Sequence, residues 1–424
     1  MGRHTGASSA VCCDPIAWFE AGLISAPSMF VLGLPGLGKS SSVRHMLIGM
    51  AARGIHSMVL GDLKPDYVDL VRALGGQVID VGVSQINPLD AGGVREAATM
   101  LDGPLREDLL ASAHQRTLTM VASLVHIIRG QAPTDREVTI LDRALGDIEA
   151  QVTDRQPTLV DLLDAIRSPC SQVRQAALDR GSWDRYQAVT EDLEASLEAL
   201  RGGKFGKIFA GETTVPMKLD RSVVFDVSAL SNAESDLQAA VLLACWSYGF
   251  ASVEVAQTLA DAGTQKRQRH FIVMDELWRI LRASSGMVDR VDALTRLNRQ
   301  MGVGQAMITH TMKDLESLAT TEDVAKAKGL VERSKIVLLG GLPHAEMRSL
   351  RDVMRLSSAE EALVTSWQDP PAWDATSGRQ TAPPGRGKFL IKVGGRPGIP
   401  VEVVLTPTEV ALHDTNKRWT HADS

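Results

Sequence analysis

The sequence predicts an α/β fold in which a mainly parallel sheet is interrupted by an inserted block of helices. Near the N-terminus, short apolar runs alternate with helical patterns, which is typical of parallel strands joined by right-handed crossovers. Residues 94–204 then show only helical periodicity. Strand patterns return after residue 221 and end in a pair of runs around a glycine-rich turn.

Composition places the chain among ordinary globular proteins. It has 424 residues, of which 44% are hydrophobic and 23% charged, enough for two or three domains. The net charge of −6 excludes a generally basic nucleic-acid coat protein but leaves room for a local basic patch. The four cysteines have no paired spacing, so we expect free thiols in a reducing compartment; they are Cys12, Cys13, Cys170 and Cys245.

Targeting and membrane signals are missing from the sequence. It contains no run of about 18 apolar residues, and no basic region followed by an apolar core marks a signal peptide. We therefore expect a cytoplasmic protein that reaches the inner face of the cell membrane only through partners.

The N-terminal third alternates strands and helices. An apolar run at Ser28–Gly33 precedes a helix at Ser40–Arg53, and a strand at Ser57–Gly61 follows. We then expect a helix from Pro65 to Leu74, because proline suits a first helical turn, and a strand at Gln77–Val81.

The remaining elements divide the chain into domains. The helical block contains four amphipathic segments, Leu105–Arg129, Arg136–Gln151, Leu159–Arg167 and Tyr186–Arg201. Later strands are expected at Ser222–Val227, Phe271–Met274, Gln305–Thr309 and Lys335–Leu339, with a helix at Glu234–Ala260 and a final hairpin of Lys388–Val393 and Ile399–Leu405. We expect a short lead-in at 1–27, a main domain of 28–93 and 205–424, and an inserted all-helical subdomain at 94–204.

The first motif that carries chemistry is a phosphate-binding loop. Its eight residues match the P-loop pattern between a predicted strand and a predicted helix: Gly33, Leu34, Pro35, Gly36, Leu37, Gly38, Lys39 and Ser40. Backbone N–H groups of such a loop, continued by Ser41, cradle the phosphates of ATP. Lys39 would contact the β- and γ-phosphates, and Ser40 would hold Mg²⁺. The motif predicts a P-loop NTPase of the RecA-like type.

A second element follows the strand Phe271–Met274. Asp275 and Glu276 stand at its carboxyl end, where open α/β sheets bind ligands. Asp275 would hold Mg²⁺, and Glu276 would polarise the attacking water. Without the P-loop, acidic residues after a buried strand would be a weak signal.

Two further candidates lie downstream. Arg299, with Arg296 as its neighbour, could stabilise charge on the transferring phosphoryl group, and His310 could act as a polar sensor after the next strand. A solvated helix end, with basic residues favoured by the helix dipole, is the competing interpretation.

The order of these elements resembles the HerA/FtsK superfamily, and within it the type IV secretion and conjugation ATPases of the VirB/TraC kind. Besides the P-loop, the similar segments are Gly61–Tyr67, Ile86–Asp90, Val224–Ser228 and Met274–Trp278. The resemblance implies an ATPase that energises conjugative DNA transfer or type IV secretion. It further implies a hexameric ring, secretion-channel or membrane subunits as partners, and an Arg299 that reaches into a neighbouring subunit.

The chain departs from that family in two places. Only about 30 residues precede the P-loop, whereas family members usually carry a large N-terminal docking domain. Thr309-His310 stands where the family tends to have Thr-Gln, and histidine adds a pH dependence that glutamine lacks.

Other readings stay open at this stage. A DNA-translocating motor of the coupling-protein or FtsK/HerA type is the alternative function, with DNA as partner, and a nucleotide-gated scaffold without turnover is the third. No histidine or cysteine cluster has the spacing of a zinc site. The basic residues between 375 and 401 fit a solvated hairpin, and Trp278 fits core packing.

Overall fold

The computed structural model describes residues 1–424 except 231, 283–286, 296–301, 375–378 and 413–424. Its contacts group the chain into two units, Met1–Gly76 together with Arg269–Ser424, and Gln77–Gln268. The predicted α/β class with a mostly parallel sheet is confirmed.

The sheet of the first unit has a parallel centre and an antiparallel flank. Its strands follow the order β2 (Ala10–Val11), β1 (Gly2–His4), β13 (Ile399–Glu402), β12 (Lys388–Lys392), β9 (Ile336–Leu339), β3 (Ser28–Leu32), β8 (Val303–Ile308), β7 (Arg269–Met274) and β4 (Ile55–Asp62). From β9 to β4 neighbouring strands are parallel, and from β12 to β2 they are antiparallel. Every residue of β3 is buried, as expected for a central strand covered on both faces.

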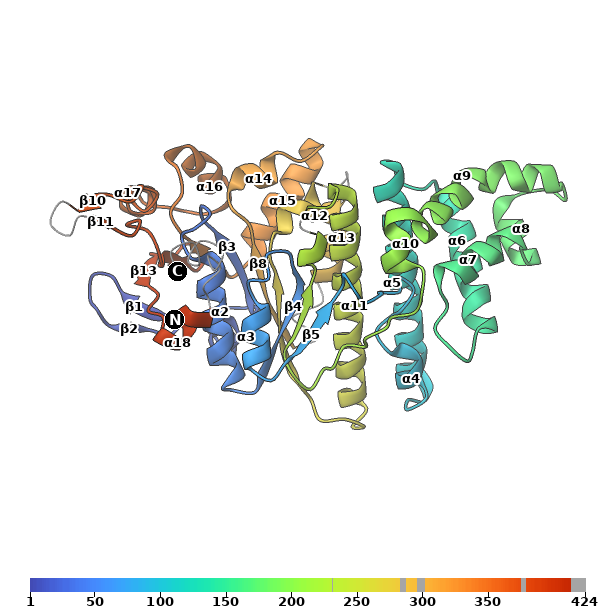
Figure 1. The fold of residues 1–424 in the computed structure, drawn as a ribbon, viewed down its shortest axis with the longest axis horizontal. Helices are drawn as coiled ribbons and strands as arrows, with labels where there is room; N and C mark the ends of the chain where they lie inside the picture. The colour runs from blue at the N-terminus through green and yellow to red at the C-terminus, as the bar shows by residue number, and fades with distance from the viewer. Residues whose placement is uncertain (231, 283–286, 296–301, 375–378, 413–424) are drawn as a thin grey trace, which may run out of the picture. The chain divides into compact units, whose positions relative to one another are not determined.

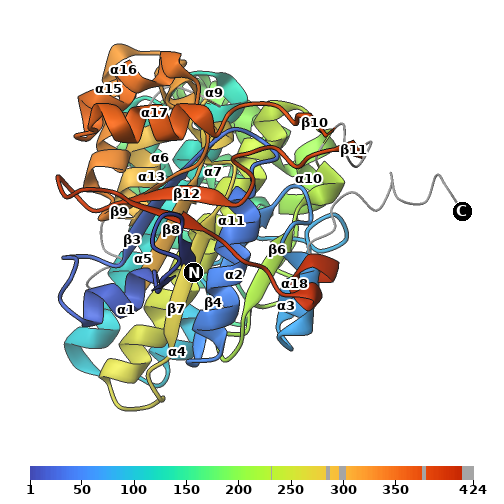
Figure 2. The same cartoon turned by 90° about the vertical axis from the view of Figure 1, so that its left-hand side faces the viewer.

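Helices surround this sheet. They are α1 (Pro15–Glu20), α2 (Lys39–Ala51), α3 (Val68–Ala73), α12 (Leu277–Leu281), α13 (Met287–Thr295), α14 (Met312–Glu316), α15 (Thr321–Arg333), α16 (Met347–Val353), α17 (Ser358–Ser366) and α18 (Pro407–Leu412). α2 packs on β4, and α14, α15 and α16 pack on one another (Figure 1). α17 contacts β12 (Figure 2). The predicted C-terminal hairpin is present as β12 and β13.

The second unit is mostly helical. Its two strands, β5 (Gln77–Asp80) and β6 (Val223–Asp226), are a parallel pair. Its helices are α4 (Val94–Ala98), α5 (Gly103–Arg129), α6 (Asp135–Gln151), α7 (Leu159–Arg167), α8 (Ser171–Ala177), α9 (Trp183–Arg201), α10 (Gly203–Phe209) and α11 (Ser235–Asp261). Figure 1 shows α6 to α9 packed against one another. All of residues 94–204 belong to this unit.

One helix has the length and composition of a membrane span. The best window of α11 has a mean hydropathy of 1.5, and 89% of that window is buried inside the fold. The sequence predicted this helix at Glu234–Ala260, and polar and small residues interrupt its apolar run; the helix packs against α5 and other helices. α11 is therefore a core helix by its surroundings.

One local prediction was wrong, and one segment contains elements that the sequence did not predict. Pro65 does not start a helix, because the Asp62 carboxylate accepts the backbone N–H groups of Asp66 and Tyr67 and closes a turn that delays α3 to Val68. The lead-in at 1–27 contains β1, β2 and α1. Strands of two or three residues carry too little periodicity to be recognised; β1 depends on pairing with β13, and β2 on pairing with β1.

Candidate nucleotide site

The P-loop joins the end of β3 to the start of α2. Gly36 and Gly38 adopt φ angles of +78° and +94°, which glycine reaches without a steric cost. Gly33 approaches the next parallel strand so closely that a Cβ atom there would lie 3.2 Å from the Cα of Gly340. Its N–H donates to the carbonyl of His310 at 2.9 Å. Neighbouring strand ends therefore fix the loop in place.

Lys39 is folded back into this loop. The residue is 7% exposed, and its Nζ donates to the carbonyls of Gly33 at 2.6 Å and Leu34 at 3.2 Å. Burial lowers the pKa of the ammonium to about 8, although the negative charges of Asp275 and Glu276 raise it. A buried ammonium held by loop carbonyls is suited to exchange them for phosphate oxygens.

Ser40 and Asp275 bring two oxygen ligands together. The Ser40 hydroxyl donates to Oδ2 of Asp275 at 3.3 Å, and the Tyr67 hydroxyl donates to the same oxygen at 3.0 Å. Burial raises the pKa of Asp275, and the charge of Glu276 raises it further. A hydroxyl and a carboxylate beside a phosphate loop fit Mg²⁺, which binds few protein ligands and completes its shell with phosphates and waters. Among the described residues, no group of three or more His, Cys, Asp or Glu side chains could hold a metal ion.

Glu276 is surrounded by three side chains of the site, Lys64, Trp278 and His310. It is 8% exposed and adopts a φ of +52° at the N-cap of α12. Lys64 Nζ lies 2.6 Å from Oε1, while Trp278 Nε1 and His310 Nε2 lie 2.6 Å and 3.4 Å from Oε2. Burial alone would raise the pKa of Glu276, but the hydrogen bonds from His310 and Lys64 hold it well below its usual range.

A turn after β4 carries two residues into the site. Asp62, 3% exposed, accepts the N–H groups of Asp66 at 2.9 Å and Tyr67 at 2.7 Å. Burial raises the pKa of this carboxyl to about 7, although both N–H groups lower it. The turn places Lys64 on Glu276 and Tyr67 on Asp275. Lys64 and Tyr67 belong to the segment Gly61–Tyr67 that carries the family resemblance, but the sequence predicted no role for either residue.

The structure brings together the predicted residues Lys39, Ser40, Asp275, Glu276 and His310 at the carboxyl ends of β3, β7 and β8. Arg296 and Arg299 lie outside the described residues.

The other predicted loop residues have structural contacts. Ser41 Oγ accepts from Arg44 at 3.1 Å, and the Leu37 carbonyl accepts from the N–H of Gly387 at 3.0 Å. Trp278, expected to pack in the core, instead donates to Glu276. The spacing that could have predicted this contact is the position of Trp278 two residues after Glu276.

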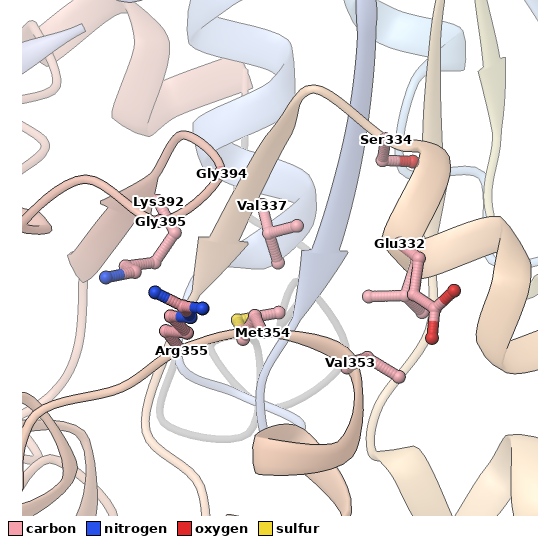
Figure 3. Close-up of a pocket in the computed structure, with 10 residues that line it drawn as sticks. Glu332, Ser334, Val337, Val353, Met354, Arg355, Lys392, Gly394 and Gly395 are labelled. Carbon is pink, nitrogen blue, oxygen red and sulfur yellow. The ribbon is translucent and has the colours of Figure 1, made fainter.

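A pocket of about 440 Å³ lies at the other edge of the first unit's sheet, near the start of β9. Figure 3 shows Lys392 and Arg355 on one side of it, and Glu332 and Ser334 on the other. It contains no P-loop residue, and Lys392 is already paired with Glu360 at 2.9 Å. This pocket is therefore separate from the candidate nucleotide site at the P-loop.

Comparison with known proteins supports the architecture. VirB4 of Thermoanaerobacter pseudethanolicus is 21% identical to this chain, with 96% of each chain covered and a TM-score of 0.71. The chain has the fold of VirB4. The bacterial conjugative coupling protein TrwBdeltaN70 is 12% identical, with 89% of this chain and 85% of that chain covered and a TM-score of 0.52.

A further similar structure is the plasmid coupling protein TrwB in complex with the non-hydrolysable ATP analogue ADPNP. It is 12% identical, covers 93% of this chain and 86% of its own, and has a TM-score of 0.50. The sequence matches no model of a protein family and no curated protein sequence. The VirB4 fold thus rests on structural likeness over nearly the whole chain.

Proposed function

We propose that the protein is an Mg²⁺-dependent ATPase that energises conjugative DNA transfer or type IV secretion. The observation that carries the proposal is the convergence of Lys39, Ser40, Asp275 and Glu276 at one edge of a parallel sheet. Each has the chemistry that phosphoryl transfer to water requires.

In this proposal each residue has one task. The loop N–H groups and the Lys39 ammonium bind the phosphates, and the Ser40 hydroxyl and Asp275 carboxylate would hold Mg²⁺. The bound metal would supply charge that offsets the phosphate oxygens. The Glu276 carboxylate accepts a proton from the attacking water, and His310, 3.4 Å from it, donates a hydrogen bond that orients it.

The site is completed by a second copy of the chain. We propose that Arg299 acts in the neighbouring subunit's site within a ring, a hexamer by resemblance. A guanidinium suits the charge that develops on the γ-phosphoryl oxygens. Residues 94–204 would form a helical subdomain inserted into an ATPase domain made of 28–93 and 205–424. The ring would act in the cytoplasm at the inner face of the membrane, bound there by secretion-channel or membrane subunits.

A DNA-translocating motor of the coupling-protein type is the alternative. The TM-score of 0.71 with VirB4 against 0.52 with TrwB favours the first function. ATP turnover measured without DNA and with single- and double-stranded DNA, beside the mass in solution, separates them. Turnover that DNA leaves unchanged, in a ring-sized particle, supports the secretion ATPase. Stimulation by DNA that falls steeply with salt would favour the DNA motor.

A further inference from the structure

Glu276 is held on both of its carboxylate oxygens. Oε2 accepts from the Trp278 indole at 2.6 Å and lies 3.4 Å from His310 Nε2, while Oε1 accepts from the Lys64 ammonium at 2.6 Å. A carboxylate oxygen accepts about two hydrogen bonds. Oε2 is therefore filled, and Oε1 has one position left for a reacting water.

The donors that hold the two oxygens differ in how firmly they are placed. Trp278 follows Glu276 on α12 and is half-buried. The guanidinium carbons of Arg279 and Arg282 lie 4.7 Å and 4.9 Å from its ring centroid. These cation–π contacts keep the indole in position. The Lys64 side chain, in contrast, is 56% exposed on a flexible four-carbon stem.

The Lys64 ammonium also lies next to the phosphate site. Glu276 directly follows Asp275, which accepts from Ser40 of the P-loop at 3.3 Å. Water that donates to Oε1 therefore shares that oxygen with Lys64, whereas it shares none with Trp278.

We propose that the two donors have opposite effects on turnover: Trp278 is a positioning residue that orients Glu276, and Lys64 restrains Glu276 as a base by pairing its ammonium with Oε1, the oxygen that has a position left for the reacting water. The inference rests on the proposed function, in which Glu276 is the base. It adds a restraint on the base itself and names the oxygen, Oε1, that takes the proton.

The positioning role is tested by Trp278→Phe, which removes the N–H donor and keeps an aromatic ring. We expect kcat to fall roughly tenfold, the order of a hydrogen bond to a charged group, with unchanged affinity for a non-hydrolysable ATP analogue. In a Glu276→Gln background the same change should alter the residual rate by less than about twofold, because the two residues act as a unit. Trp373→Phe, at a side chain that is 68% exposed, is the matched control.

A second variant guards against misfolding of the first. Benzothienylalanine at position 278 keeps the shape of tryptophan and replaces the N–H by sulfur, and it should show the same fall in kcat. A normal kcat in both variants at position 278 would overturn the positioning role. A fall in the Glu276→Gln background equal to the fall in the wild-type background would also overturn it.

The restraint is tested by Lys64→Met. We expect kcat to rise roughly threefold, the scale of a partly exposed ion pair, with little change in analogue affinity. Lys326 lies on α15, and its Nζ is 2.8 Å from Oδ2 of Asp289. As the matched control, Lys326→Met should leave kcat unchanged. A kcat at or below the wild-type value in Lys64→Met would overturn the restraint. If wild-type turnover does not depend on Lys39, the proposed function itself fails, and that result is separate from these.

Discussion

Two buried lysines stand at opposite edges of the first unit's sheet. Lys39, 7% exposed, follows the carboxyl end of β3, and Lys392, 3% exposed, ends β12 beside the start of β9. The Lys39 ammonium donates to two loop carbonyls at 2.6 Å and 3.2 Å. Lys392 donates to the Glu360 carboxylate at 2.9 Å and to the Arg396 carbonyl at 2.8 Å.

The difference separates a binding lysine from a structural one. Burial lowers the pKa of Lys39 to about 8, so its charged form gains when an anion arrives. Around Lys392 the charge is already balanced. Burial would raise the pKa of Glu360, but the N–H of Ser357 and the Lys392 ammonium lower it to about 2. We infer that the P-loop edge is built to receive an anion, whereas Lys392 at the other edge serves an internal ion pair.

We expect the largest effect from Arg299→Ala, which tests whether another subunit completes the nucleotide site at the P-loop. We expect nearly normal ATP binding and a loss of hydrolysis of roughly 10³–10⁵-fold, because no guanidinium meets the developing charge. Mixing Arg299→Ala with Lys39→Ala subunits should restore some turnover in rings shown to exchange subunits. If exchange occurs and mixtures recover nothing, the role in trans is wrong, and Arg296 or Arg333 becomes the candidate.

Glu276→Gln separates binding from chemistry at the same edge. An amide cannot accept the proton from water, so kcat should fall roughly 10²–10⁴-fold while Mg²⁺·ATP binding is kept. Glu360→Gln, at the other edge, is the control and should keep its turnover. Normal turnover of the Glu276→Gln variant would show that the carboxylate is not the base.

Asp275→Asn tests the metal ligand next to that base. Loss of a charged oxygen ligand should raise the Mg²⁺ concentration needed for half-maximal turnover by roughly 10–100-fold. The Mg²⁺ titration of Glu276→Gln, measured through nucleotide binding, should stay close to that of the wild type. Equal shifts in both variants would contradict the assignment of the two neighbours to different tasks.

The pH dependence of ATP affinity gives the smallest effect. Because the pKa of free Lys39 is lowered to about 8, its charge is present below that pH and is lost as the pH rises through it. ATP affinity should therefore fall above about pH 8, by up to roughly tenfold at pH 9. Titration by fluorescence or calorimetry between pH 7 and 9.5 measures this, and a flat affinity across the range would disagree.

The stabilisation of the fold by the Lys392–Glu360 pair, at the other edge, depends on pH in the opposite direction. A carboxyl whose folded pKa is depressed stabilises the fold above its unfolded pKa. The contribution of Glu360 is therefore fully present above about pH 4.5 and is lost as the pH falls towards 2. Unfolding midpoints measured between about pH 2 and 4.5 test this loss of stability.

Local sequence patterns predicted the parts of the site that lie within one loop or one strand end. The P-loop and the Asp275-Glu276 pair are contiguous, and parallel strands must bring their carboxyl ends to one edge. Tyr67 and Lys64 could not be placed in this way. Their partners are 208 and 212 residues away in the sequence, and only the folded turn after β4 brings them close.

The errors have the same origin. Proline at position 65 favours a helix start locally, but the buried Asp62 carboxylate captures the N–H groups that a helix would use. β1 and β2 form because β13 offers an edge, which no local pattern shows. Tryptophan is typical of a hydrophobic core, but the αL backbone of Glu276 turns the Glu276 carboxylate towards the indole N–H of Trp278.

The central claim is most directly tested by ATP turnover and unfolding free energy measured together for the wild type, Lys39→Ala and Lys392→Met. We predict that Lys39→Ala loses turnover and keeps its stability, because its ammonium serves the ligand. Lys392→Met should keep turnover and lose about 3 kcal/mol of unfolding free energy, because it leaves Glu360 without its cation. Wild-type turnover in Lys39→Ala would contradict the account.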